Sequence, residues 1–342
     1  MVSTTLGHIE RDGAYLMLLR NKKKNDLNEG KWIGIGGHVE AGETPAACMK
    51  REAYEETGLT LHHPKLRGVV EFRSERWEDE HMYVYTCPEF EGELTECSEG
   101  ELRWIPKEQI FDLPLWEGDK VFLNYLLSDE PFFHLELRYD AEDRLVGAEQ
   151  LPKLILASQS PRRYELLTQI GLMPVVLPSE KEEKRHGEGP EELVKNLSAM
   201  KAEDVAETYA FSNGEVVLGA DTIVVVDGEI LGKPHTHEEA AEMIRRLQGR
   251  THEVLSGVTL IRCGGPKGRV KKSFAERTEV TVYPMTEEEI LLYAESDEPM
   301  DKAGAYGIQG SFAAFIKGIS GDYSNVVGLP VGRVWHELHD FL

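Results

Sequence analysis

The stretch that decides the fold of the first half of the chain is residues 37–59, GHVEAGETPAACMKREAYEETGL. It contains Thr44 directly before Pro45, and it ends on Gly58 followed by an apolar residue. Threonine is a good N-cap, proline fits the first helical position, and glycine is favoured just past the last turn of a helix. The stretch therefore predicts one helix that begins after Thr44 and ends before Gly58.

Three carboxylates share one face of this predicted helix. Glu52, Glu55 and Glu56 are spaced i, i+3 and i+4, so their side chains are neighbours on the helix surface. Carboxylates this close repel one another, and a hard divalent cation with oxygen ligands would relieve the repulsion. An acidic stripe exposed to solvent is the alternative, and the three glutamates taken alone favour it.

The frame around these glutamates decides between the two alternatives. It resembles the Nudix box, GxxxxxE, seven residues and REUxEExGU, at every defining position, with Ala53 and Leu59 at the apolar sites. The resemblance implies an α/β/α sandwich with a mixed sheet that hydrolyses a nucleoside diphosphate linked to another group. It also implies that the three glutamates bind a divalent metal cation, Mg²⁺ or Mn²⁺, and that the last two of them are directly catalytic. Arg51 is then expected to pair with Glu43.

Substrate choice in this family depends on residues outside the box. Residues 115–119, LWEGD, resemble a segment of the MutT-like subgroup that acts on oxidised purine triphosphates. The resemblance implies that Trp116 stacks on the base and that Asp119 bonds to its edge, although Gly118 stands where a second acidic residue would be expected. A role for Trp116 as a core aromatic residue stays open. Glu101 is expected as a further metal ligand or base.

The second half of the chain opens with an apolar run that leads into a polar turn, residues 154–163, LILASQSPRR. The run predicts a buried strand, and Ser160 with Pro161 predicts a helix start. Free backbone N–H groups and the helix dipole make such a start an anion site. Arg162 and Arg163 add forked donors that suit phosphate oxygens. An ordinary capped helix with solvated arginines explains this segment equally well.

An acidic residue lies inside the next apolar run. Asp221 falls within residues 216–226, and a buried acid needs a partner or a chemical task. Lys201 and Lys233 can supply cations, and residues 301–310 form a glycine-rich loop with a lysine. The order of predicted strands and helices indicates an α/β domain.

Together these segments resemble the Maf family over residues 152–342, through the motifs SxSPRR, ADTIV, GKP, DKAGAYGIQG and GDYSNVVGLP. The last two motifs favour the branch that hydrolyses dTTP and UTP. The resemblance implies a domain with a central cleft, Asp221 as general base, and Glu183 with Glu182 at a divalent metal. The amide of Gln309 can donate and accept, which suits the edge of a pyrimidine. The substrate-binding residues expected from the resemblance are Arg162, Arg163, Lys201, Thr222, Lys233 and Gln309.

Length and composition agree with two enzymatic domains. The chain has 342 residues, which exceeds the usual size of one core, so we expect domains at residues 1–150 and 151–342. The formal net charge of −23 argues against a nucleic-acid surface, and the apolar runs are too short to span a membrane. The four cysteines form no CxxC pair, and no secretory signal is visible, which favours a reduced, cytoplasmic setting.

The expected function is therefore hydrolysis of nucleoside triphosphates to a monophosphate and pyrophosphate by both domains, which would cleanse nucleotide pools. We also expect a homodimer formed through the second domain. Two alternatives stay open. The second domain would act by binding, as a regulator of septum formation, or the first domain would cleave a nucleotide sugar or a dinucleotide.

Overall fold

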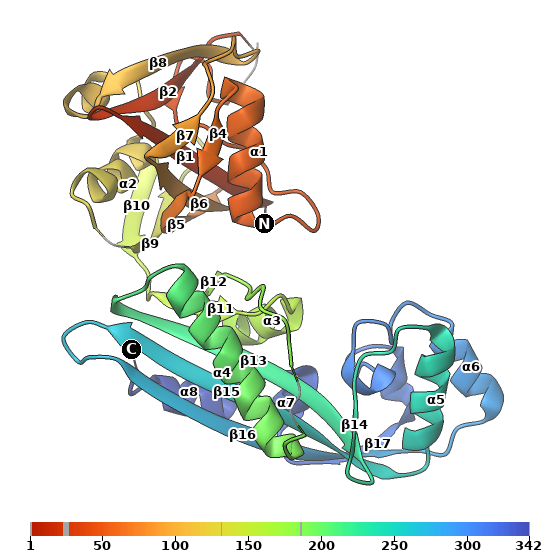
Figure 1. The fold of residues 1–342 in the computed structure, drawn as a ribbon. Coiled ribbons are helices and arrows are strands. Elements are labelled where there is room, and N and C mark those ends of the chain that lie inside the picture. Colours follow the sequence, from red (N-terminus) through yellow and green to blue (C-terminus); the bar gives the residue numbers. More distant parts are fainter. Residues whose placement is uncertain (1, 23–26, 131, 185–186, 342) are drawn as a thin grey trace. The chain divides into compact units, whose positions relative to one another are not determined.

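The computed structural model of the chain describes residues 2–22, 27–130, 132–184 and 187–341 (Figure 1). The chain forms two compact units, Met1–Pro152 and Lys153–Leu342. Each unit has its own sheet and its own buried apolar cluster. Within the described ranges, no helix is both long enough and apolar enough to cross a membrane.

The first unit is built on an eight-stranded sheet with the order β10-β9-β5-β6-β1-β2-β3, and β8 pairs with β2. The pairs β1–β6 and β5–β9 are parallel, and the other pairs are antiparallel, so the expected mixed sheet is confirmed. The strands are β1 (Val2–Arg11), β2 (Ala14–Arg20), β3 (Trp32–Ile33), β5 (Lys65–Ser74), β6 (Glu80–Cys87), β8 (Gly100–Pro106), β9 (Phe133–Tyr139) and β10 (Leu145–Gln150). A separate two-stranded sheet pairs β4 (Thr60–His62) with β7 (Glu89–Glu91).

The predicted helix of the first unit is α1 (Pro45–Thr57), and both predicted caps are confirmed. The Thr44 hydroxyl accepts a hydrogen bond from the backbone N–H of Ala47, and Gly58 adopts the left-handed conformation with φ 76°. The remaining helical elements are η1 (Lys107–Asp112) and α2 (Glu117–Leu127).

Helices cover both faces of this sheet. On the α1 side, the Thr5 hydroxyl of β1 lies 3.4 Å from the Cys48 sulfur. Side chains alternate across a strand, so Met82, next to the register partner of Thr5 on β6, faces the opposite side. Met82 belongs to the same buried cluster as Phe122 and Leu126 of α2. The arrangement is therefore the α/β/α sandwich expected from the sequence.

The second unit has a seven-stranded sheet with the order β12-β11-β13-β15-β16-β17, and β14 pairs with β13. β11 is parallel to its two neighbours, whereas β13, β15, β16 and β17 run antiparallel. The alternation of strands and helices predicted from the sequence therefore describes only the part of the sheet around β11. Five residues join β15 to β16, which is too short for a crossover helix, so these long strands form a hairpin. The strands are β11 (Leu154–Ala157), β12 (Val175–Val176), β13 (Asn213–Val226), β14 (Glu229–Leu231), β15 (Thr251–Gly264), β16 (Val270–Val282) and β17 (Ile316–Ser320).

Helix α4 (Pro190–Thr208) lies along one face of this sheet because two strands carry glycine beneath it (Figure 1). A Cβ at Gly219 would lie 2.2 Å from the Ser198 carbonyl oxygen, and one at Gly257 would lie 2.1 Å from that of Val194. No other residue type allows this approach. The helical elements are α3 (Pro161–Gln169), α4 (Pro190–Thr208), α5 (His237–Leu247), α6 (Glu287–Ala294), η2 (Ala303–Ala305), η3 (Ser311–Phe315), α7 (Tyr323–Val327) and α8 (Val331–Leu338).

Candidate functional site

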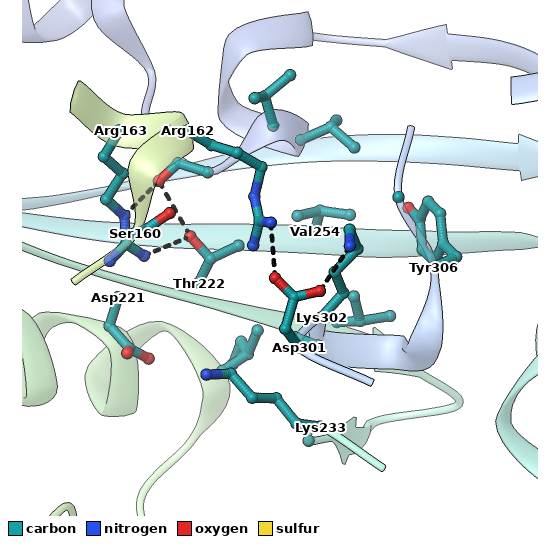
Figure 2. Close-up of a pocket in the computed structure, with 18 of the residues that line it drawn as sticks. Ser160, Arg162, Arg163, Asp221, Thr222, Lys233, Val254, Asp301, Lys302 and Tyr306 are labelled. Atoms are coloured by element: carbon teal, nitrogen blue, oxygen red, sulfur yellow. Dashed lines mark hydrogen bonds and ion pairs between the residues drawn. The ribbon is translucent and has the colours of Figure 1, made fainter. Parts of the chain in front are cut away.

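A cavity of about 1000 Å³ opens in the second unit, and it collects most of the residues that the sequence singles out there (Figure 2). Its walls come from the end of β11, the start of α3, the middle of β13 and the loop 301–310. The mixture of cations and carboxylates makes it a site for a charged, anionic ligand. The charged residues that line it are Arg162, Arg163, Lys201, Lys233, Lys302, Glu183, Asp221, Glu239 and Asp301.

Asp221 lies in β13 with 8% of its surface exposed. The ammonium of Lys201, on α4, lies 2.7 Å from Oδ1 of Asp221 and also 2.7 Å from Oε1 of Glu183. Burial opposes ionisation of Glu183, but the ammonium groups of Lys201 and Lys233 outweigh it and lower the pKa of this carboxyl. Two carboxylates therefore converge on one positive charge at the edge of the cavity.

The two arginines of the SPRR turn have different environments. Arg163 is buried, and its guanidinium donates to the Gly328 carbonyl at 2.9 Å, the Ser158 hydroxyl at 2.8 Å and the Thr222 hydroxyl at 3.2 Å. Burial lowers its pKa, and the carboxylate of Asp221 opposes that shift. Arg163 thus ties β11, β13 and the segment before α8 together at the base of the cavity.

Arg162 instead faces a carboxylate across the cavity. Its Nη1 donates to Oδ2 of Asp301 at 2.9 Å, and the other oxygen of Asp301 lies 2.5 Å from the Lys302 ammonium (Figure 2). Asp301 was not among the residues expected from the sequence. An acid followed by a lysine at the start of a glycine-rich loop was the available signal, but nothing in the sequence places Arg162 beside it.

The remaining predicted residues of this unit are distributed as follows. Lys233 and Gln309 line the cavity, and Gln309 is exposed there. The hydroxyl of Thr222 also lines it but is engaged with Arg163 and lies 2.8 Å from the Ser256 hydroxyl. Glu182 is 83% exposed, does not line the cavity and lies 3.8 Å from Lys184.

In the first unit, Arg51 connects the glycine-rich loop to α1. Its Nε and Nη2 donate to the two carboxylate oxygens of Glu43 at 3.0 and 2.9 Å, which confirms the predicted pair. Its Nη1 donates to Glu52 at 2.7 Å and to Glu55 at 3.3 Å. The hydrogen bonds that its guanidinium donates to Glu43 and Glu52 raise the pKa of Arg51.

The three glutamates of α1 are not equally exposed. The sequence predicts that Glu55 and Glu56 both face solvent. The Glu55 side chain is 57% exposed, but Glu56 is buried at 8% exposure, so the prediction is wrong for Glu56. Glu56 accepts a hydrogen bond at 3.1 Å from the backbone N–H of Gly36, because this part of α1 packs against the glycine-rich loop. Burial, with the nearby charges of Glu99 and Glu52, raises the pKa of Glu56 to about 8.

The structure places Glu99, rather than Glu101, beside this carboxylate cluster. Glu99 raises the pKa of Glu56 through its charge and pairs with Arg20 of β2. Glu101 lies on β8, half exposed, with its carboxylate 2.6 Å from Arg103. The run SEGE offers two acids two residues apart, and only the register of β8 shows which one reaches α1. Within the described ranges, no three His, Cys, Asp or Glu side chains are already arranged as a metal site.

Trp116 and Asp119 lie at the start of α2. The indole N–H of Trp116 donates to Asn28 at 2.8 Å, and the ammonium of Lys31 lies 4.9 Å from its ring centre. Burial and the charge of Glu80 raise the pKa of Asp119 to about 7, with Lys31 opposing the shift.

The glycine that departs from the MutT-like pattern has a local cause. The backbone N–H of Gly118 donates to the Tyr139 hydroxyl at 2.8 Å, and a Cβ at this position would lie 2.3 Å from that oxygen. An acidic side chain at position 118 would therefore collide with Tyr139.

Two family models match the chain. The model described as Maf-like protein matches residues 153–341, and the model described as NUDIX domain matches residues 5–126. The two matches fall in the second and the first unit, respectively.

Among its relatives, the chain is 48% identical over 198 residues to a dTTP/UTP pyrophosphatase from Agathobacter rectalis, which covers 55% of this chain and 97% of that protein. It is 52% identical over 192 residues to a dTTP/UTP pyrophosphatase from Symbiobacterium thermophilum, which covers 56% of this chain and 95% of that protein. It is also similar to the crystal structure of the mutator protein MutT from Bacillus halodurans, at 26% identity and a TM-score of 0.40, covering 44% of this chain and 97% of that one.

Proposed function

The chain belongs to the Maf family through residues 153–341 and carries a Nudix domain at residues 5–126, and from this premise we propose that it is a bifunctional nucleotide pyrophosphatase. The second unit would hydrolyse dTTP and UTP, the activity named for relatives about half identical to it. The observation that carries the proposal is the cavity in which Asp221 lies beside Lys201, among further cations that suit a triphosphate.

The chemistry of the second unit follows from this placement. A triphosphate that enters the cavity competes with Asp221 for the ammonium of Lys201, which frees an oxygen of Asp221 to accept a proton. The oxygen of a water molecule attacks the phosphorus next to the nucleoside as Asp221 takes one of its protons. The bond from that phosphorus to the bridging oxygen breaks, and the products are a nucleoside monophosphate and pyrophosphate. Lys233 and Arg162 would hold the charge on the departing phosphates.

The same site fits a divalent cation. Asp221 and Glu183 already converge on one positive charge, at 2.7 Å from each, and two carboxylates with substrate phosphates are the donor set that Mg²⁺ or Mn²⁺ prefers. A cation held by Glu183 and one oxygen of Asp221 would neutralise phosphate charge and leave the other oxygen of Asp221 to accept the proton. Glu182 is 83% exposed and does not line the cavity, so we assign the pair Asp221 and Glu183 only.

For the first unit we propose hydrolysis of a purine nucleoside triphosphate. Glu52, Glu55 and Glu56, with Glu99 as the additional acid, would hold Mg²⁺ or Mn²⁺, because they supply hard oxygen ligands along one face of α1 and next to it. Trp116 offers an aromatic surface for a base, such as that of an oxidised purine.

A nucleotide panel on the full chain tests both proposals. Pyrophosphate release is measured with dTTP, UTP, dGTP and 8-oxo-dGTP in Mg²⁺ or Mn²⁺. Asp221→Asn should remove dTTP and UTP hydrolysis and leave the purine activity intact, and Glu56→Gln should do the reverse. If neither pyrimidine triphosphate is hydrolysed by the wild-type chain, the proposal for the second unit is wrong. A nucleotide sugar or dinucleotide that is hydrolysed faster than any purine triphosphate contradicts the proposal for the first.

A further inference from the structure

One ion pair bridges the two walls of the charged cavity. Arg162 stands at the start of α3, and Asp301 begins the loop on the opposite wall, 139 positions further along the sequence. In the part of the chain that the structure describes, Asp301 is the one hydrogen-bonding partner of the Arg162 guanidinium. This arginine has five donors, so most of them stay available to a ligand.

Asp301 is held in place from behind. The Lys302 ammonium lies 2.5 Å from Oδ1 of Asp301 and donates to the Glu298 carbonyl at 2.6 Å. The Glu298 carboxylate in turn accepts from the backbone N–H and the hydroxyl of Ser311, at 2.9 and 2.7 Å, and from the Tyr293 hydroxyl at 3.0 Å. The carboxylate at position 301 is therefore preorganised by its loop, although its side chain is 60% exposed.

We propose that Asp301 is a positioning residue that competes with phosphate for Arg162, and so limits the affinity of the cavity for pyrophosphate. This inference rests on the proposed function, because it takes the cavity to be the place where pyrophosphate is made. A carboxylate and a phosphate offer the same kind of acceptor oxygens to a guanidinium fork. Any phosphate ligand must break the Arg162–Asp301 pair before it can use that arginine.

The competition acts on product release. Pyrophosphate has no base to contact the rest of the cavity, so the cations hold it alone. When pyrophosphate leaves, Asp301 is ready to pair with Arg162 again, and the guanidinium is not left without a partner. Removing the carboxylate should therefore make pyrophosphate leave more slowly, and it should lower KM together with kcat rather than kcat alone.

Binding of inorganic pyrophosphate to the full chain tests the proposal. Titration calorimetry is done in EDTA, so that the acidic cluster of the first unit, without a cation, does not bind the probe. Asp301→Asn should bind pyrophosphate about tenfold more tightly than wild type, equivalent to about 1.4 kcal/mol. Asp301→Glu should restore the wild-type dissociation constant, and pyrophosphate should inhibit dTTP hydrolysis by Asp301→Asn at about tenfold lower concentration. Unchanged or weaker binding by Asp301→Asn overturns the proposal.

Two further variants separate this role from a general charge effect. Asp297→Asn removes the same charge from an exposed side chain that does not line the cavity, and it should leave the affinity for pyrophosphate unchanged. In an Arg162→Ala background, Asp301→Asn should no longer raise the affinity for pyrophosphate, because the arginine for which Asp301 and phosphate compete is absent. A gain that persists in that background overturns the proposal even if the wild-type chain hydrolyses dTTP and UTP. A wild-type chain that hydrolyses neither nucleotide instead contradicts the proposed function, whatever the pyrophosphate affinities.

Discussion

Replacing Glu56 by glutamine should remove the first activity and at the same time stabilise the first unit at neutral and higher pH. Glu56 is buried, and its pKa is raised from the ordinary value of 4.5 to about 8. A carboxyl with a raised pKa in the folded state gives stability that is complete below pH 4.5 and is lost as the pH rises through 8. Each pKa unit corresponds to about 1.36 kcal/mol, so wild type should lose about 3–4 kcal/mol between pH 5 and pH 8 through this group. Glutamine does not ionise, so the variant escapes that loss.

The assay is urea unfolding in EDTA at pH 5, 7 and 8, followed by tryptophan fluorescence. Four of the five tryptophans lie in the first unit, at positions 32, 77, 104 and 116, so the signal reports mainly on that unit. The stability difference between Glu56→Gln and wild type should grow with pH. Glu55→Gln is the matched control, since it changes the same charge on an exposed side chain of the same helix and should show no such growth. A difference that is independent of pH, or a variant less stable than wild type at pH 8, would refute the reasoning.

Three other predictions follow from the same structure. Asp221→Asn should slow dTTP and UTP hydrolysis by about 10²- to 10⁴-fold in a pyrophosphate-release assay, because the base is lost. The binding of dTTP to this variant, measured by calorimetry in EDTA, should persist or tighten, because a negative charge is removed from the cavity. Gly257→Ala should destabilise the second unit by about 3 kcal/mol or more in thermal unfolding, because its Cβ would lie 2.1 Å from the Val194 carbonyl oxygen; a change below about 1 kcal/mol would contradict this close packing. The KM of the first unit for purine triphosphates should rise between pH 6 and pH 8, since the Asp119 carboxyl, with a pKa of about 7, loses the proton that it can donate to a base. Asp119→Asn should flatten this rise. An unchanged dependence of KM on pH would exclude Asp119 from the base site.

Local signals carried most of the secondary structure. The caps of α1 and the apolar runs of β11 and β13 depend on residues close in sequence, and each appears where it was expected. The direction of the strands was harder to predict from the sequence. The five residues between β15 and β16 impose a hairpin only once the ends of both strands are known, and the sequence does not mark those ends. The antiparallel half of the second sheet therefore emerged only from the structure.

In the candidate sites too, the sequence predicts contacts within one motif but not contacts that depend on the tertiary fold. The resemblance to the Nudix box was enough to predict the Arg51–Glu43 pair, because both residues lie in one continuous motif. It could not show that Glu99 rather than Glu101 lies beside Glu56, since that depends on the register of β8 against β2. It also could not place Asp301 beside Arg162, because only the tertiary fold joins positions so distant in sequence.

The first unit presents carboxylates at its site and the second presents paired cations. This difference explains how a chain with a net charge of −23 can act on polyanions. In the first unit, the neighbouring carboxylates of Glu52 and Glu55 on α1 repel an anion until a cation binds between them and the phosphate. In the second unit, Lys201 and Arg162 are already neutralised by carboxylates of the protein, so a phosphate exchanges one anionic partner for another. Both arrangements act over a few ångströms, whereas the net charge acts through a solvent that screens it within about 8 Å at physiological salt. Local pairing, and not the sign of the whole surface, therefore decides which ligands these sites can accept.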